Sequence, residues 1–184
     1  MFEQVTLLLS FVYALALTHL LASVTELTLA RDRVRFSGLH ALWMGIALVV
    51  LFNNWLQAHA LKDIRRWTLP EEALQFAWAM AQYFTCSLVS IRVEPGAAVD
   101  MEAFHARQRP AIMIAFASLT VMAMLGNYLD RSGPDWIGQD LLNLPMLALI
   151  GVAGVARAKW LQWAAGVGVL ALVLGFLTVY PPQG

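Results

Sequence analysis

The sequence predicts an all-α integral membrane protein, a bundle of six transmembrane helices with both termini outside. Hydrophobic residues make up 60% of the 184 residues and charged residues only 13%. Soluble domains are typically about half apolar and about a quarter charged. The apolar residues gather in six stretches, each near the roughly 20 residues that a helix needs to cross a bilayer. Every Lys and Arg falls between those stretches, where it avoids the cost of a charge in hydrocarbon.

Charge and cysteine content exclude further classes. The 12 basic residues balance the 12 acidic ones, so the chain has no electrostatic attraction for nucleic acid. The single cysteine, Cys86, cannot form an internal disulfide. The N-terminus has neither a basic segment nor a small-residue cleavage site, so we expect the first span to serve as its own insertion signal.

The chain is predicted to form a single transmembrane domain. Its third span is the most polar and begins after Thr68-Leu69-Pro70-Glu71, a capping box with Pro in the first helical turn. The sixth span is nearly all apolar and is expected to face lipid. Trp43 and Trp160 lie near predicted inner boundaries, as in an aromatic belt. The six predicted spans are residues 5–29, 38–61, 70–91, 110–129, 137–156 and 160–180.

The longest predicted loop, residues 92–109, is expected to be cytoplasmic. Asp100 is expected to cap a short surface helix there, with Met101 and Phe104 dipping into the membrane interface. Lys and Arg concentrate in cytoplasmic loops, and they set the orientation. With the N-terminus outside, the inner loops hold eight of them and the outer loops four. This bias predicts that both termini are outside.

Polar side chains on the first span form one stripe. The five residues of this stripe follow one another at spacings of four, three, four and three, which place them on one helical face. His19 lies near the predicted midplane, and Glu26 lies about one turn inside the inner end. We interpret His19 as a proton-relay or ligand residue; the alternative is a packed histidine bonded to a neighbouring helix. The members of the stripe are Val12, Ala16, His19, Ser23 and Glu26.

The second and third spans add further polar groups. His40 enters the second span at a depth similar to that of Glu26, so a Glu26–His40 contact is expected at the inner mouth. Asn53 and Gln82 could converge with His19 near the midplane and form a polar cavity. The alternative is that these amides only join helices, at about 1 kcal/mol per hydrogen bond.

Binding of a cofactor by His19 and His40 is the role for which the sequence gives the least support. A b-type haem held by His19 and His40 needs both at one depth, and in upright helices they differ by roughly 9–10 Å. Helix tilt could close that gap. The sequence shows no phosphate-binding loop, metalloprotease motif, nucleophile elbow or potassium filter, and so predicts no enzyme activity.

The first third of the chain resembles a group of small bacterial multi-pass inner-membrane proteins. The shared features are Thr18-His19-Leu20-Leu21, the Arg-rich turn that follows, and His40-Ala41-Leu42-Trp43. The group has no assigned activity. The resemblance implies a multi-pass inner-membrane protein, makes His19 and His40 residues to test, and supplies no substrate.

Three hypotheses follow for the function. The first is a small channel or transporter, either alone or as a homo-oligomer in the lipid bilayer, with a path past His19, Gln82 and Asn53 and a mouth at Glu26 and His40. The second is an accessory subunit of a larger membrane complex. The third is a haem or metal protein that uses His19 and His40.

Overall fold

A computed structural model describes residues 2–57, 69–129 and 136–179. It contains a short 3-10 turn, Arg31–Arg33, and two short strands, β1 (Val34–Arg35) and β2 (Val99–Asp100). The described residues are otherwise mostly helical, which confirms the all-α class. The six helices are α1 (Phe2–Leu29), α2 (Gly38–Gln57), α3 (Leu69–Val89), α4 (Met101–Leu129), α5 (Trp136–Val155) and α6 (Lys159–Val179).

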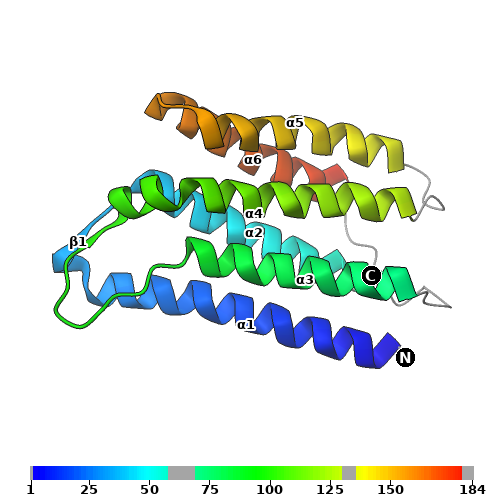
Figure 1. Cartoon of the computed structure of the whole chain (residues 1–184), viewed down its shortest axis with the longest axis horizontal. Coiled ribbons are helices and arrows are strands. Elements are labelled where there is room, and N and C mark those ends of the chain that lie inside the picture. Colours follow the sequence, from blue (N-terminus) through cyan, green and yellow to red (C-terminus); the bar gives the residue numbers. More distant parts are fainter. Residues whose placement is uncertain (1, 58–68, 130–135, 180–184) are drawn as a thin grey trace.

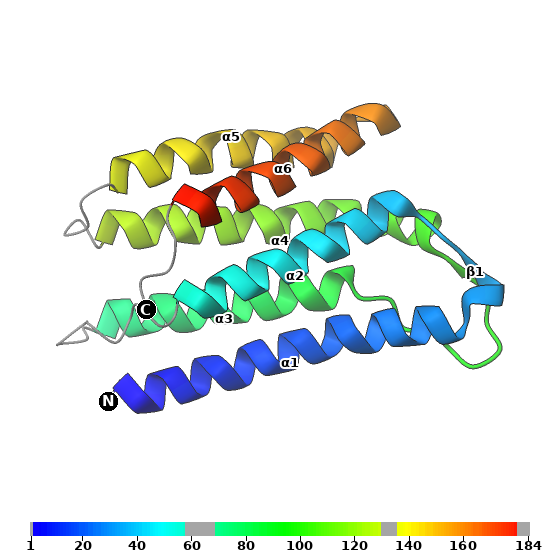
Figure 2. The ribbon, with the colours of Figure 1, turned by 180° about the vertical axis from the view of Figure 1, so that it is seen from behind.

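The helices form two layers (Figures 1 and 2). Helices α1, α3, α4 and α5 lie side by side in one layer, and α2 and α6 lie across its back. Successive helices alternate in direction, so α1 begins and α6 ends at the same end of the bundle. Helix α2 is central, because it packs against α1, α3, α4 and α6.

Four helices are long and apolar enough to cross a membrane: α1, α2, α4 and α6. Over the described residues, α3 and α5 do not meet the same measure. Helix α3 carries Glu71 and Glu72 in its first turn, and the apolar part of α5 is the shorter stretch Asp140–Val155. The crossing of all six helices, and the side on which the termini lie, stay predictions.

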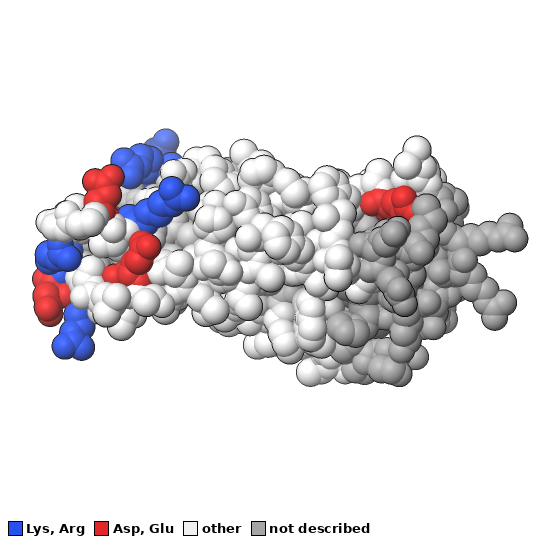
Figure 3. Space-filling view, turned by 90° about the horizontal axis from the view of Figure 1, so that it is seen from below, with Lys and Arg blue, Asp and Glu red and all other residues white. Residues whose placement is uncertain are grey.

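Basic side chains, with several acidic ones among them, gather at one end, whereas the other end shows, in the part of the chain that the structure describes, acidic side chains without basic ones (Figure 3). The connections α1–α2, α3–α4 and α5–α6 meet at the end with the basic side chains, as the predicted inner loops require. Among the described residues every Lys and Arg lies at this end, which we call the charged end. Lys62, Arg65, Arg66 and Arg131, together with the Thr68 cap predicted for the third span, lie outside the described residues. The eight basic residues of the charged end are Arg31, Arg33, Arg35, Arg92, Arg107, Arg109, Arg157 and Lys159.

The helix that contains the fourth predicted span begins earlier than that span. Helix α4 begins at Met101 and runs through Pro110 without a break. Asp100 does cap a helix, since the backbone N–H of Ala103 donates to its Oδ1 at 2.9 Å, but the helix is α4 itself. The residues before Pro110 are ordinary helix formers, and a helix can pass through Pro if one backbone hydrogen bond is given up. Met101 is buried in the protein rather than in the membrane interface.

The core also corrects two expectations about membrane-facing residues. Trp43 is fully buried on α2, where its ring lies 5.1 Å from that of Phe116, whereas Trp160 is exposed. Helix α6 is exposed on one side only, with Trp160, Val167 and Leu174 among its exposed residues. Its other side packs on α2 so closely that a Cβ on Gly166 would lie 2.8 Å from the Leu42 side chain. Small residues permit such approach between membrane helices.

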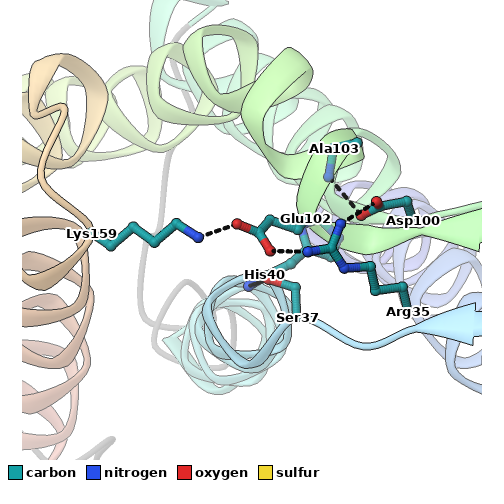
Figure 4. A network of polar contacts seen from close by, with 7 residues as sticks. All are labelled: Arg35, Ser37, His40, Asp100, Glu102, Ala103 and Lys159. Atoms are coloured by element: carbon teal, nitrogen blue, oxygen red, sulfur yellow. Dashed lines mark hydrogen bonds and ion pairs between the residues drawn. The ribbon is translucent and has the colours of Figure 1, made fainter.

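A small parallel sheet closes the charged end, with Val34 opposite Val99 and Arg35 opposite Asp100. Figure 4 shows the ion pairs beside it. Arg35 binds Asp100 at 2.9 Å and Glu102 at 3.4 Å, and Lys159 at the start of α6 binds the same Glu102. The bond from Ala103 and the charge of Arg35 lower the pKa of Asp100. These contacts join three connections that are far apart in the sequence.

Candidate functional site

The polar stripe of α1 faces α3. Val12, Ala16 and Ser23 are buried, and His19 and Glu26 are half-buried beside them. Helix α1 packs mainly on α3, so the stripe meets α3 and the segment that follows it. The 3.6-residue period thus places these five residues on one inward face.

A pocket of about 320 Å³ lies between this stripe and the end of α3. Seven residues separate His19 from Glu26, so His19 is about 10 Å deeper along the helix. Arg92 and Glu94 are exposed at the rim. The pocket therefore leads from the charged end toward the middle of α1. Its lining residues are His19, Ala22, Ser23, Glu26, Ser87, Ser90, Ile91, Arg92, Val93, Glu94 and Pro95.

His19 lies at the deep end of the pocket. Its Nε2 shares a hydrogen bond of 3.0 Å with the hydroxyl of Tyr83 on α3, and the two rings meet edge to face. Which group donates depends on the tautomer of the imidazole. An imidazole bonded to a phenol can accept a proton at one atom and release one at another, which suits a relay.

Ser23 and Glu26 shape the wall opposite α3. The backbone N–H of Ile91 donates to Ser23 Oγ at 2.8 Å, and that of Val93 donates to Glu26 Oε2 at 2.9 Å. These bonds hold the segment after α3 against α1. The chain then turns at Gly96, whose φ of 82° favours glycine. Glu26 therefore contacts this segment, where the sequence suggested His40 as its partner.

His40 takes a partner that the sequence did not identify. Its Nδ1 lies 3.3 Å from Nδ1 of His105 on α4, and its Nε2 donates to the carbonyl of Val89 at 2.9 Å. A carbonyl only accepts, so a neutral His40 carries its proton on Nε2 and accepts at Nδ1 from His105. Ser37 caps the helix start by accepting from the backbone N–H of His40 at 3.4 Å (Figure 4).

His105 went unnoticed because residues 92–109 were predicted to be a loop. Its signal was present in the sequence. The run from Met101 to Arg109 contains no helix breaker, so the helical period of the fourth span extends back through Pro110 to His105. His105 is almost fully buried, and the ring of Phe104 meets that of His40 edge to face, with ring centroids 5.3 Å apart.

Gln82 belongs to a separate buried cluster between α2 and α3. Asn54 Nδ2 donates to Gln82 Oε1 at 2.9 Å, and Gln82 Nε2 donates to Cys86 Sγ at 3.3 Å. Asn53, the predicted partner, is not the residue that binds Gln82. Its Oδ1 is buried without a hydrogen-bond partner. The structure thus distributes the predicted path residues over different helix interfaces, and only His19 and Glu26 line the same pocket.

The bis-histidine haem hypothesis does not fit these contacts. His40 uses both ring nitrogens inside the protein, and its Nε2–H points to the Val89 carbonyl. His19 contacts Tyr83 on another interface. Within residues 2–57, 69–129 and 136–179, no three His, Cys, Asp or Glu side chains are grouped closely enough to hold a metal ion.

Comparisons with models of protein families, with curated proteins and with solved structures found no match. The class of the protein rests on its own structure. It is an all-α helical bundle, and four of its helices fit a membrane protein by length and composition.

Proposed function

We propose that the protein is a small channel or transporter of a bacterial inner membrane, and that its polar path begins in the pocket between α1 and α3. One observation carries the proposal. The pocket starts among charged residues at one end of the bundle and ends at His19, about 15 Å inside the end of α1. Ionisable side chains at such depth are costly in a bilayer and mark solute or proton paths by default.

The orientation of the path follows from its charges. The rim lies at the charged end, where every described Lys and Arg is found. Because such residues favour the cytoplasmic side, the pocket opens toward the cytoplasm and both termini lie outside. Gln82, Asn53 and His40 are no longer part of the proposed path.

The far half of the α1–α3 interface is closed. The α1 residues there are buried, namely Leu9, Val12, Tyr13 and Ala16. Tyr83, which bonds to His19, covers the deep end of the pocket. We therefore interpret the structure as a state in which the proposed path is open at the charged end and closed at the other end. Transport across the bilayer would require α1 and α3 to separate beyond His19, as alternating access does around a central site.

Flux in proteoliposomes tests the proposal. Purified protein is reconstituted, and uptake of protons and of a panel of small radiolabelled solutes is compared with that of empty vesicles. The test variants are His19→Phe, which keeps a ring but removes its nitrogens, and Tyr83→Phe, which removes only the hydroxyl. Trp160→Phe is the control away from the pocket, because Trp160 is an exposed ring on α6 that does not line the pocket. We expect both test variants to lower flux at least tenfold. Flux at empty-vesicle levels across the panel, or equal flux in wild type and His19→Phe, would contradict the proposal.

A further inference from the structure

The wall of the pocket holds hydrogen-bond acceptors that are free to bind a ligand. Its two buried backbone donors are already used, since Ile91 N–H binds Ser23 and Val93 N–H binds Glu26 Oε2. Ser90 gives its hydroxyl proton to the carbonyl of Cys86 at 2.7 Å, which leaves its lone pairs free. Glu26 keeps its second oxygen, Oε1, which accepts no hydrogen bond from the residues that the structure describes. The free lone pairs of Ser90 and Glu26 can therefore accept hydrogen bonds from a ligand that carries N–H donors.

The charge of the lining points the same way. Glu26 and Glu94 carry two negative charges against the one positive charge of Arg92, which is exposed at the rim. The backbone N–H groups of Ile91 and Val93, which could hold an anion inside the pocket, are taken by Ser23 and Glu26, and the cationic group of the lining, Arg92, lies at the rim. A cation meets a half-buried carboxylate inside the pocket, and a charge-assisted bond to it is about twice as strong as a neutral one.

The kind of cation follows from the remaining wall. The described residues provide no group of three metal ligands, which disfavours a bare metal ion. Apart from His19, the lining holds no aromatic ring, so it lacks the cage that binds quaternary ammonium groups. A protonated primary amine has three N–H donors for Glu26 and the serines. The pocket volume is about 320 Å³, and Ala22 and Pro95 are exposed apolar residues of its lining that a short chain can contact.

We infer that the pocket between α1 and α3 binds a small primary ammonium ion, with its charge against Glu26 and its short alkyl chain against Ala22 and Pro95. The inference rests on the proposed function in that it names the solute class of the same pocket. Binding is measured without transport, so the two statements are tested separately.

The experiment is calorimetric titration of the full-length protein in detergent with n-propylammonium chloride. Tetramethylammonium chloride supplies the charge without N–H donors, and sodium acetate supplies an anion of similar size. We expect propylammonium to bind, and tetramethylammonium and acetate to bind at least tenfold more weakly. Glu26→Gln keeps the size of the side chain and removes its charge, so it should weaken propylammonium binding at least tenfold. Asp32→Asn is the matched control, because Asp32 is an exposed carboxylate of the charged end that does not line the pocket.

Four outcomes would overturn the inference: no binding of propylammonium, equal binding of tetramethylammonium, tighter binding of acetate, or equal losses in Glu26→Gln and Asp32→Asn. Solute flux through His19 without amine binding would overturn it and leave the transport proposal standing. Amine binding without flux of any solute would confirm the inference and contradict the transport proposal. A melting curve of each variant shows that it is folded.

Discussion

The pocket between α1 and α3 and the histidine pair between α2 and α4 contain similar side chains, and they differ in what those side chains have left to bind. His40 and His105 are buried, and both ring nitrogens of His40 are hydrogen-bonded, one to His105 and one to the carbonyl of Val89. In the pocket, Glu26 keeps an oxygen free and His19 faces open volume. Polar groups whose hydrogen bonds are all made within the protein join helices. Polar groups that still have a free donor or acceptor beside open volume can bind a ligand. Residue type and depth alone do not separate the two.

The largest effect should come from breaking the histidine pair. In His105→Ala the buried Nδ1 of His40 loses its donor and a cavity forms, so we expect the free energy of unfolding to fall by about 2–4 kcal/mol. His19→Ala opens onto an existing pocket and should lower it by about 1 kcal/mol or less. Denaturant unfolding in mixed micelles, followed by circular dichroism, measures both. Equal losses would remove the distinction between the two regions.

Water should reach the pocket and not the core. Ser87 lines the pocket, whereas Ala79, two turns earlier on α3, is fully buried. We expect a charged methanethiosulfonate reagent to label Ser87→Cys at least tenfold faster than Ala79→Cys. The native Cys86 is buried and contributes little background. Labelling of inverted and of right-side-out vesicles also tests the orientation, since labelling only from the periplasmic side would reverse it.

The Gln82 cluster should behave as a joint between helices. Gln82→Leu leaves Asn54 Nδ2 without its acceptor, so we expect a loss of about 1 kcal/mol in the free energy of unfolding. The double variant Asn54→Leu/Gln82→Leu should recover part of that loss, because neither amide is then left unpaired. The same unfolding assay applies. Propylammonium binding that falls tenfold in Gln82→Leu would show that the cluster belongs to the ligand site.

The smallest effect concerns the charged end. Asp100→Asn keeps the helix cap and removes the charge that Arg35 binds, so the melting temperature at pH 7 should fall by about 1 °C. The folded pKa of Asp100 is lowered, so its contribution is present above the unfolded pKa of about 3.9 and is lost as pH falls through the folded value. The difference between variant and wild type should therefore shrink below about pH 4. A difference that grows toward acid pH would contradict this assignment.

Patterns along single helices were predictable from the sequence. The stripe from Val12 to Glu26 needs only the helical period, and the gathering of basic residues needs only the alternation of spans. Partners across helices were not predictable. Whether Gln82 meets Asn53 or Asn54 depends on the rotation of α2, and a partner for His40 required knowing that α4 starts at Met101. Strands of two residues, such as β1 and β2, have no period to detect.

The central position of α2 has a consequence for the synthesis of the protein. Helix α2 is the second to be made, but α6, the last, covers one of its faces at Gly166 and Leu42. Until α6 leaves the ribosome, the side chains beside Leu42 lack the neighbours that α6 provides. The bundle therefore completes its interior only after translation of its final helix, and a nascent chain that stops before Lys159 also lacks the cation that binds Glu102.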